Sequence, residues 1–237
     1  MLGQSVITKQ GMVIESVAFE ASRQLTVSIA QRVVALTNKG VAMKTSGIAH
    51  SGVTGGFERA TEMLSDEHRV IERVLDIMEK LTQGSVDHTL ESWKQVLDFV
   101  RHFADQCHHL KEEKILFPAM EEHGIPNEGG PIGMMLMEHE EGRSYVRSMF
   151  AAVALIEAKD QAARESLLTS ARAYLRLLRE HIQKEDQILF RIADDVIPAE
   201  EHQQLLRTFE EHEARELGTG IHDKYLLIVQ ALEASIE

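Results

Sequence analysis

The chain has 237 residues, of which 43% are hydrophobic and only 5% aromatic, and it contains four prolines. This composition favours an all-α protein and argues against a β-sandwich. The formal net charge of −13 makes nucleic acid and anionic membranes poor partners, because an acidic surface repels phosphate groups.

The cysteine content and the hydropathy pattern bear on the compartment. A single cysteine, Cys107, excludes an intramolecular disulfide and fits a reducing environment. No stretch approaches the roughly 18 consecutive apolar residues of a membrane span, and the N-terminus lacks the pattern of a secretory signal. We therefore expect a cytoplasmic protein, while the sequence does not predict its oligomeric state.

Residues 1–57 differ in composition from the rest of the chain. They contain five Lys or Arg and two Glu, are rich in Ser, Thr, Val and Gly, and end in TSGIAHSGVTGG. Such a composition is typical of a linker. Apolar residues between Ile14 and Leu36 keep helical spacing, so the segment can form one amphipathic helix. We expect an N-terminal extension without catalytic groups.

From residue 58 the apolar residues recur every three or four positions, which is the period of an amphipathic α-helix. Thr89 is expected to cap the second helix and Pro118 to kink it, and the loop GIPNEGGPIG follows. The expected helices cover residues 61–83, 89–123, 131–158, 161–196, 199–216 and 222–235. The four long helices predict an up-down-up-down bundle over 58–197, with the helices of 198–237 packed on it.

The second and fourth helices contain an internal repeat. HHLKEEKILF, which starts at His108, aligns with HIQKEDQILF, which starts at His181, at an offset of 73 residues. The first and third helices repeat more weakly, as LSDEH ending at His68 and MLMEH ending at His139. The chain therefore resembles two related helical hairpins, each with one early His and one His-x-x-x-Glu.

The His-x-x-x-acid spacing is weak evidence by itself. With 38 acidic residues in the chain, about two such pairs are expected by chance among twelve histidines. Five histidines have the spacing, so the position of each pair on its helix must decide. These histidines are His68, His108, His109, His181 and His212.

Two of the pairs lie on core-facing stripes, where one turn of helix places Glu112 beside His108 and Glu185 beside His181. In the fourth helix the stripe is expected to continue through Ile188. A buried carboxylate costs many kcal/mol unless it is paired, neutralised or bound to a metal. Carboxylates that bridge two cations and imidazoles that cap them suit borderline metals such as iron. The candidate metal ligands are His68, His108, Glu112, His139, His181 and Glu185.

Together, the LxxEH motif, CHHLKEEKILFP, the EH of MLMEHEEGR and REHIQKEDQILF resemble the hemerythrin-like, or HHE cation-binding, family over about residues 60–196. The resemblance implies a four-helix bundle that holds a non-haem di-iron centre with an oxygen bridge and room for a small ligand. It assigns His68 and His108 to one iron, His139 and His181 to the other, and Glu112 and Glu185 to the bridges.

The chain departs from oxygen-carrying hemerythrins at two places. Those proteins have an H-x-x-x-H pair on the third helix, where this chain has Met135 four positions before His139. This difference argues against reversible oxygen carriage. They also place the second carboxylate five residues after its histidine, where Asp186 stands here. The register with the second helix and the core stripe favour Glu185.

Neighbouring residues allow two interpretations. His109 and Glu113 lie about 100° around the helix from the candidate ligands beside them, so we expect them at the rim of the site or in contact with its ligands from outside. Cys107 is either a small buried residue or a redox-active thiol. Tyr174, two turns before His181, is either part of the core or a hydroxyl in the pocket.

Three functions fit these features. The first is a di-iron protein that binds or senses O₂, NO or peroxide, and the second is an enzyme that consumes peroxide or NO at the same centre. The third is a metal-free structural bundle. The sequence separates the first two poorly.

Overall fold

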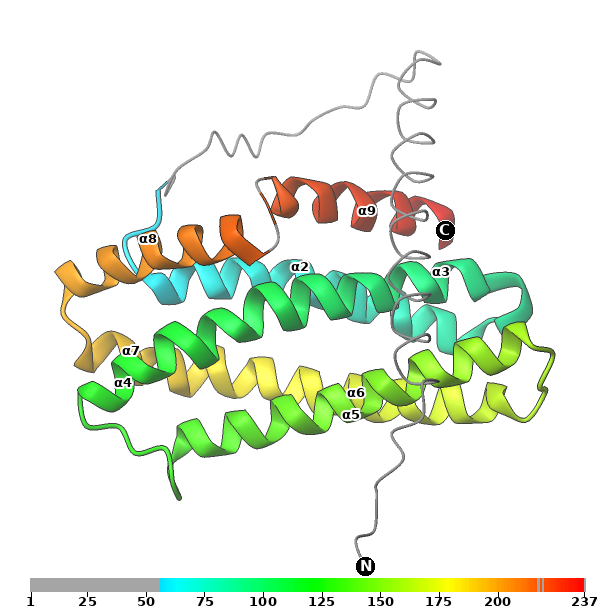
Figure 1. Ribbon diagram of the computed structural model, residues 1–237, viewed down its shortest axis with the longest axis horizontal. Coiled ribbons are helices and arrows are strands. Elements are labelled where there is room, and N and C mark those ends of the chain that lie inside the picture. Colours follow the sequence, from blue (N-terminus) through cyan, green and yellow to red (C-terminus); the bar gives the residue numbers. More distant parts are fainter. Residues whose placement is uncertain (1–55, 217, 219, 237) are drawn as a thin grey trace, which may run out of the picture. The chain divides into compact units, whose positions relative to one another are not determined.

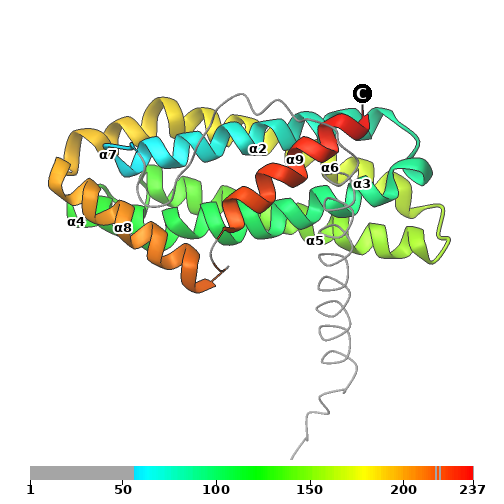
Figure 2. The same cartoon turned by 90° about the horizontal axis from the view of Figure 1, so that it is seen from above.

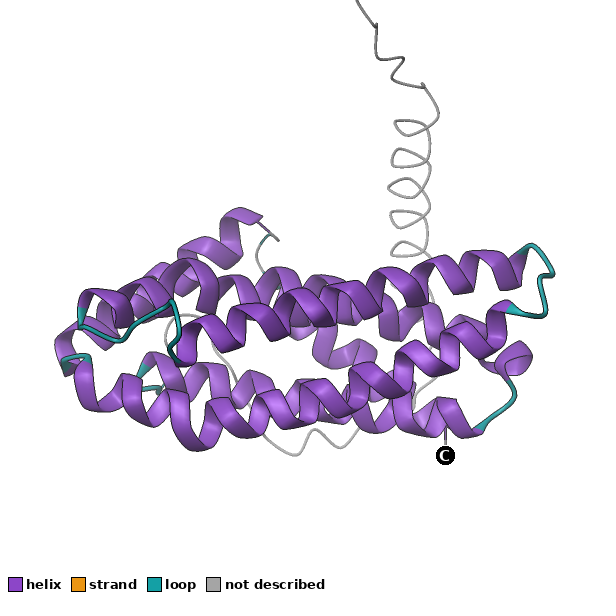
Figure 3. Ribbon diagram, turned by 90° about the horizontal axis from the view of Figure 1, so that it is seen from below, coloured by secondary structure: helices purple, strands orange, loops and turns teal. Residues whose placement is uncertain are grey.

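The computed structural model describes residues 56–216, 218 and 220–236, and within these ranges all regular structure is helical (Figure 3). The chain divides into two compact units, 1–50 and 51–237, and every described residue belongs to the second. The helix expected between Ile14 and Leu36 lies outside the described residues. None of the described helices has the length and apolar character needed to cross a lipid bilayer.

The first long helix, α2 (Ala60–Gln83), has nearly the predicted bounds. It begins where the Glu62 carboxylate accepts the backbone N–H of Arg59 at 3.1 Å, and it ends at Gly84, whose N–H donates to the Leu81 carbonyl. All six residues of the predicted stripe are buried. These are Leu64, His68, Ile71, Leu75, Met78 and Leu81.

The second rod is continuous and starts earlier than predicted. Ser85, not Thr89, stands at its N-cap position, and Thr89 lies in the first turn, where its hydroxyl donates to the Ser85 carbonyl. The predicted cap at Thr89 is therefore wrong. The rod consists of α3 (Val86–Phe99), the π-helical segments η1 (Val100–His109) and η2 (Glu112–Leu116), and α4 (Phe117–Glu122).

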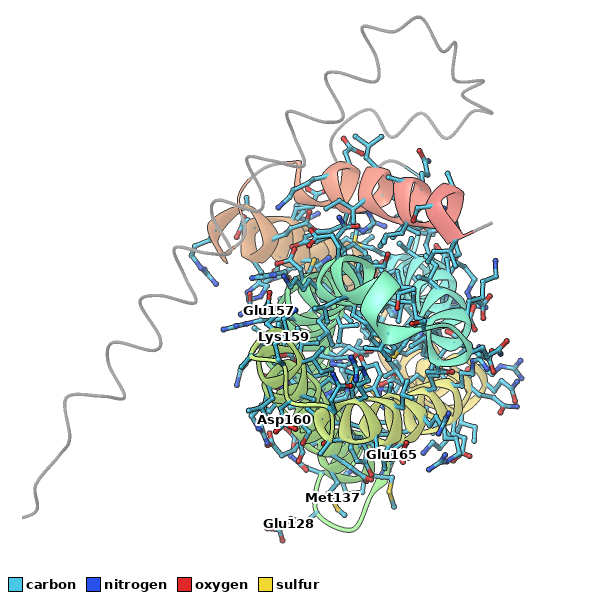
Figure 4. All side chains as sticks on the ribbon, turned by 90° about the vertical axis from the view of Figure 1, so that its right-hand side faces the viewer. Glu128, Met137, Glu157, Lys159, Asp160 and Glu165 are labelled. Carbon is cyan, nitrogen blue, oxygen red and sulfur yellow. The ribbon has the colours of Figure 1, made fainter. Side chains whose placement is uncertain are left out.

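The third rod, α5 (Pro131–Glu157), ends in a Schellman turn. Lys159 has a φ of 70°, and its N–H donates to the Ile156 carbonyl while the N–H of Asp160 reaches Leu155. Figure 4 labels Lys159 and Asp160 at this end of the bundle. The fourth rod runs antiparallel to α5 and consists of α6 (Ala163–Lys184), η3 (Glu185–Leu189) and α7 (Phe190–Val196).

The four rods form the predicted bundle, and two further helices cover one side of it (Figure 1). These helices, α8 (Ala199–Glu216) and α9 (Ile221–Ile236), lie against the α2 and α3 side, away from α5. Viewed from above, α9 crosses over α2 and α3 (Figure 2). Phe209 of α8 and Tyr225 of α9 are buried in the contact. The predicted fold class is confirmed.

The core stripe of the fourth rod shifts by one residue after Glu185. Ile188, which we expected in the core, is 55% exposed, whereas Leu189 is buried. The physical reason is the π-turn η3, where the N–H of Phe190 donates to the carbonyl of Glu185, five residues earlier. The extra residue in the turn rotates every later side chain. In η2 the N–H of Phe117 bonds in the same way to Glu112.

The π-turn η2 lies just before Pro118, which is in the first turn of α4. A proline there has no N–H to donate and would interrupt a regular α-helix. The wider turn lets the chain pass the proline without ending the rod. The two π-turns begin at Glu112 and Glu185, which are equivalent positions of the repeat.

Candidate metal centre

The structure brings the six predicted ligands together inside the bundle. They come from all four rods and meet near its middle, because the stripes of the four rods converge at that level. Each is at most 1% exposed. The six are His68, His108, Glu112, His139, His181 and Glu185.

Each glutamate contacts histidines of both hairpins. Glu185 places Oε2 3.3 Å from Nε2 of His68 and 3.2 Å from Nε2 of His181. Glu112 places Oε1 3.6 Å from Nε2 of His108 and Oε2 3.5 Å from Nε2 of His139. Because each carboxylate spans two histidines from different hairpins, the arrangement suits a pair of bridged ions.

The Nε2 atoms of His139 and His181 lie 3.1 Å from each other, but the other inward-facing polar atoms are buried without hydrogen-bond partners among the described residues. These atoms are Nε2 of His68, Nε2 of His108 and all four carboxylate oxygens of Glu112 and Glu185. An unpaired buried polar group costs about 1–3 kcal/mol, and more if it is charged. Nitrogen and oxygen donors that converge without partners are what a cation would satisfy, so these residues fit a metal centre.

The donor atoms form two overlapping groups, and within each group they lie within 4.8 Å of one another. Glu112 belongs to both groups. Their division matches the predicted assignment of histidines to two ions, with one addition, His109. One group is His68, His108, Glu112 and Glu185, and the other is His109, Glu112, His139 and His181.

Burial and neighbouring charges shift the pKa values of the centre in different directions. Burial and the charge of Glu185 raise the pKa of Glu112 well above its usual range. Burial acts the same way on Glu185, but His181 and His68 outweigh it and hold the pKa of Glu185 well below its usual range. Burial lowers the pKa of His108 to about 4. For His181 the same burial effect is outweighed by Glu185 and Glu138, which raise its pKa to about 9.

Each of the four predicted histidine ligands uses its outer nitrogen to donate to a carboxylate. The distance from Nδ1 to the carboxylate oxygen is 2.8 Å for His68 with Asp186 and 2.9 Å for His108 with Glu67. It is 2.8 Å for His139 with Glu113 and 2.9 Å for His181 with Glu138. Such bonds place the proton on Nδ1, turn Nε2 toward the centre and make the imidazole a stronger ligand.

A basic side chain pairs with each of these outer carboxylates. The pairs are Asp186–Arg69, Glu67–Lys111, Glu113–Arg143 and Glu138–Lys184. Each of these four candidate ligands therefore belongs to a chain of imidazole, carboxylate and basic side chain.

Most of this outer layer follows the repeat, although the sequence analysis placed only Glu113 of it at the rim. Glu67 and Glu138 directly precede the early histidines, and each accepts from the later histidine of its own hairpin. Lys111 and Lys184 are also equivalent in the repeat. The signal that could have found these residues was the Glu-His dipeptide, which both early motifs contain.

His109 lies deeper than the rim position that the sequence analysis allowed for it. It is only 5% exposed, and its ring stacks on that of His139 at 4.1 Å between centroids and 16° between planes. Its Nδ1 is buried without a hydrogen-bond partner among the described residues. The π-helical segment η1 explains the difference, because more residues per turn reduce the rotation between neighbours. The equivalent position of the repeat is Ile182.

The remaining candidates lie outside the centre. Asp186, the alternative to Glu185, accepts from Nδ1 of His68 and from the Ser65 hydroxyl, so the geometry favours Glu185 as the inner carboxylate. Glu113 lies at the rim, as expected, and bonds to His139. Cys107 is fully buried, and burial raises the pKa of its thiol, which keeps it protonated. Tyr174 is also buried.

Comparison with known proteins agrees with the resemblance. The model of the hemerythrin HHE cation-binding domain matches residues 59–193. Curated relatives include uncharacterized proteins of Mycobacterium bovis and Mycobacterium tuberculosis, each 29% identical over 180 residues, which is 75% of this chain and 70% of the relative. No solved structure matches. With a match over more than half of its length, the chain belongs to the hemerythrin HHE cation-binding family.

Proposed function

We propose that this protein holds two iron ions in the centre of its bundle and uses them to bind or sense a small oxidant or diatomic molecule, namely O₂, NO or peroxide. The observation that carries the proposal is the set of buried nitrogen and oxygen atoms without partners at the level where the four rods meet. Membership of a cation-binding family supports it.

In this proposal, His68 and His108 hold one ion, His139 and His181 hold the other, and Glu112 and Glu185 bridge them. His109 adds a third imidazole to the second ion, which supports an open position on the first. The donors are imidazole nitrogens and carboxylate oxygens, which suit iron. Iron would supply reversible ligation of small molecules and one-electron chemistry.

The protein contributes orientation, charge and exclusion of water. The outer carboxylates hold a proton on Nδ1 of each ligand histidine, so Nε2 can offer its lone pair to a metal ion. Because the six residues are at most 1% exposed, only a small molecule could reach them without opening the bundle. Met135, Met149 and Leu178 are buried too, and they extend the apolar wall of the bundle interior.

The proposal is tested by anaerobic reconstitution with ferrous iron, followed by metal analysis and optical spectra. We expect close to two irons per chain and a spectrum that changes when O₂, NO or peroxide is added. A protein that retains no iron, or a spectrum indifferent to all three molecules, would overturn the proposal. Consumption of peroxide or NO over many turnovers would assign an enzymatic function instead of sensing.

The same preparation tests the metal-free structural bundle. A centre built around ions should make the folded chain more stable when metal is bound, because binding energy adds to folding energy. We expect a chelator to lower the melting temperature. An unchanged melting temperature after complete removal of metal would favour the structural interpretation.

A further inference from the structure

We propose that the C-terminal helices α8 and α9 are part of the metal centre: through Glu213 and His222 they fix the orientation of His108, and so they set the affinity for one of the two ions. This inference rests on the proposed function, because it assumes that His108 is a ligand. It assigns Glu213 and His222 as positioning residues, which do not touch the ions.

Glu67 is the point where the C-terminal helices join the centre. Its side chain is 1% exposed and has three neighbours that can donate to it. Nδ1 of His108 lies at 2.9 Å, Nζ of Lys111 at 2.5 Å, and Nε2 of His222 at 3.2 Å. Since His222 belongs to α9, the carboxylate that orients a candidate metal ligand is held partly by a helix outside the four-helix bundle.

Lys111 provides the second connection. Its side chain is fully buried, and its Nζ lies 2.5 Å from Glu67 and 3.0 Å from Glu213 of α8. A buried ammonium is costly unless it is well paired, and two carboxylates satisfy that need here. Glu213 therefore holds Lys111 in place, and Lys111 holds Glu67 in place for its bond to His108.

This cluster also resembles a third cation site. Ligand atoms of Glu67, Cys107 and Glu213 lie within 4.8 Å of one another. The ammonium of Lys111 contacts two of the three residues and supplies the positive charge that a metal would bring. The cluster is therefore better described as a built-in ion pair that supports His108 than as an additional metal site.

The other hairpin shows what the C-terminal helices add. Glu138 is equivalent to Glu67 and accepts from Nδ1 of His181 at 2.9 Å, and it pairs with Lys184. Lys184 is 36% exposed, whereas its equivalent Lys111 is fully buried. The helices α8 and α9 cover α2 and α3 but not α5 (Figure 1). Of the two equivalent pairs, only Glu67–Lys111 is covered by the C-terminal helices. Loss of that cover should therefore lower the affinity for only one ion.

The test uses the full chain and titrates it with cobalt(II) against a competing chelator. The variants are Glu213→Gln, which removes the charge and keeps the shape, and Glu211→Gln, a matched control at an exposed position of the same helix. Wild type and Glu211→Gln should each bind two ions, and each ion should have the same affinity in the two proteins. Glu213→Gln should lower the affinity for one ion about 10-fold, the lower end of effects reported for outer-layer residues, and leave the other unchanged.

A second readout reports on His108 itself. In the zinc-loaded protein, the Nδ1–H resonance of His108 should exchange with water faster in Glu213→Gln than in wild type, while that of His181 stays the same. Equal affinities and equal exchange in the variant and wild type would overturn the inference. If wild type binds no metal at all, the proposed function fails instead, so the two failures are distinguishable.

A pair of substitutions at His222 covers the case in which Glu213→Gln does not fold. His222→Gln retains a donor for Glu67 and should preserve both affinities. His222→Leu removes the donor and should weaken the same single ion that Glu213 supports. Identical binding by the two His222 variants, or weakening of both ions by His222→Leu, would contradict the assignment.

Discussion

Lys111 and Lys184 occupy equivalent positions of the repeat and pair with equivalent glutamates, yet one is fully buried and the other is 36% exposed. The difference arises outside the repeat, because α8 and α9 pack mainly against the hairpin that contains Lys111. The comparison teaches that the repeated residues determine the chemistry of the centre, whereas the environment of each half depends on what packs against it.

The two hairpins also differ at one inner position. His109 of the first hairpin stacks on His139, while the equivalent residue of the second hairpin is Ile182. The first hairpin therefore adds an imidazole to the candidate ion site that the second hairpin mainly forms. Glu112 and Glu185 are equivalent in the repeat, whereas His109 has no histidine counterpart in the second hairpin.

Replacement of the two lysines gives the largest expected difference in stability. Lys111→Met leaves Glu67 and Glu213 without their buried counter-ion, which should lower the free energy of unfolding by about 3–5 kcal/mol. Lys184→Met breaks a partly exposed pair and should cost about 1 kcal/mol or less. Urea denaturation of the metal-free variants measures both values. If both variants lose a similar free energy of unfolding, the difference in burial between Lys111 and Lys184 has no effect on stability.

Replacement of the bridging carboxylates should reveal the symmetric part of the centre. In the proposed centre Glu112 and Glu185 each contact both ions, so Glu112→Gln and Glu185→Gln should each weaken binding of both ions on the order of 100-fold. Metal titration of the two variants should give matching results. Asp186→Asn is the control for Glu185, because it changes only the outer partner of His68. Equal losses in Asp186→Asn and Glu185→Gln would contradict the assignment of Glu185 as the inner carboxylate.

His109→Ile makes the first hairpin match the second at this position and tests the asymmetric part. As a ligand, His109 should contribute to one ion only, so the variant should lose on the order of 10-fold in affinity for that ion. The metal-free variant should be more stable by roughly 1–3 kcal/mol, because a buried nitrogen without a partner is removed. Opposite signs for metal affinity and metal-free stability distinguish a ligand from a packing residue.

The covering helices have a buried histidine of their own. Nδ1 of His202 accepts the N–H of Ala60 at the start of α2, and its Nε2 lies 3.7 Å from Asp194. Burial and, to a smaller extent, Arg59 lower the pKa of His202. Asp194 acts in the opposite direction, and so do Glu201 and Glu62.

The smallest expected effect follows from the sign of this shift. Because the folded chain resists protonation of His202, the unfolded chain binds more protons as the pH falls through about 6.5, and the free energy of unfolding should decrease. His202→Gln should show a weaker decrease between about pH 7 and pH 5, measured by urea denaturation of metal-free protein. If His202→Gln keeps the pH dependence of the wild type, protonation of His202 does not contribute to the loss of stability at low pH.

The extent to which the sequence predicts the structure differs between the inner and the outer part of the site. Helical periodicity was sufficient for the bundle and for the six inner residues, since a polar residue on an apolar stripe must face the core. It failed where the helices become π-helical, at Ile188 and at His109, because a turn with five-residue hydrogen bonds has no signature in composition.

Apart from Glu113, the roles of the outer carboxylates were missed for a different reason. Glu67 and Asp186 lie on different rods from the histidines that they hold, so no spacing along the chain connects the partners. The contribution of α8 depends on tertiary contacts in the same way. Repetition of the Glu-His dipeptide in both hairpins was the signal that the chain offered.

The central claim is tested most directly by anomalous scattering from crystals of the iron-loaded protein. The account predicts two iron peaks inside the bundle, one next to Nε2 of His68 and His108 and one next to His139 and His181, with Glu112 and Glu185 in contact with both. A single peak, or iron bound only at the surface while these side chains keep their present arrangement, would contradict it.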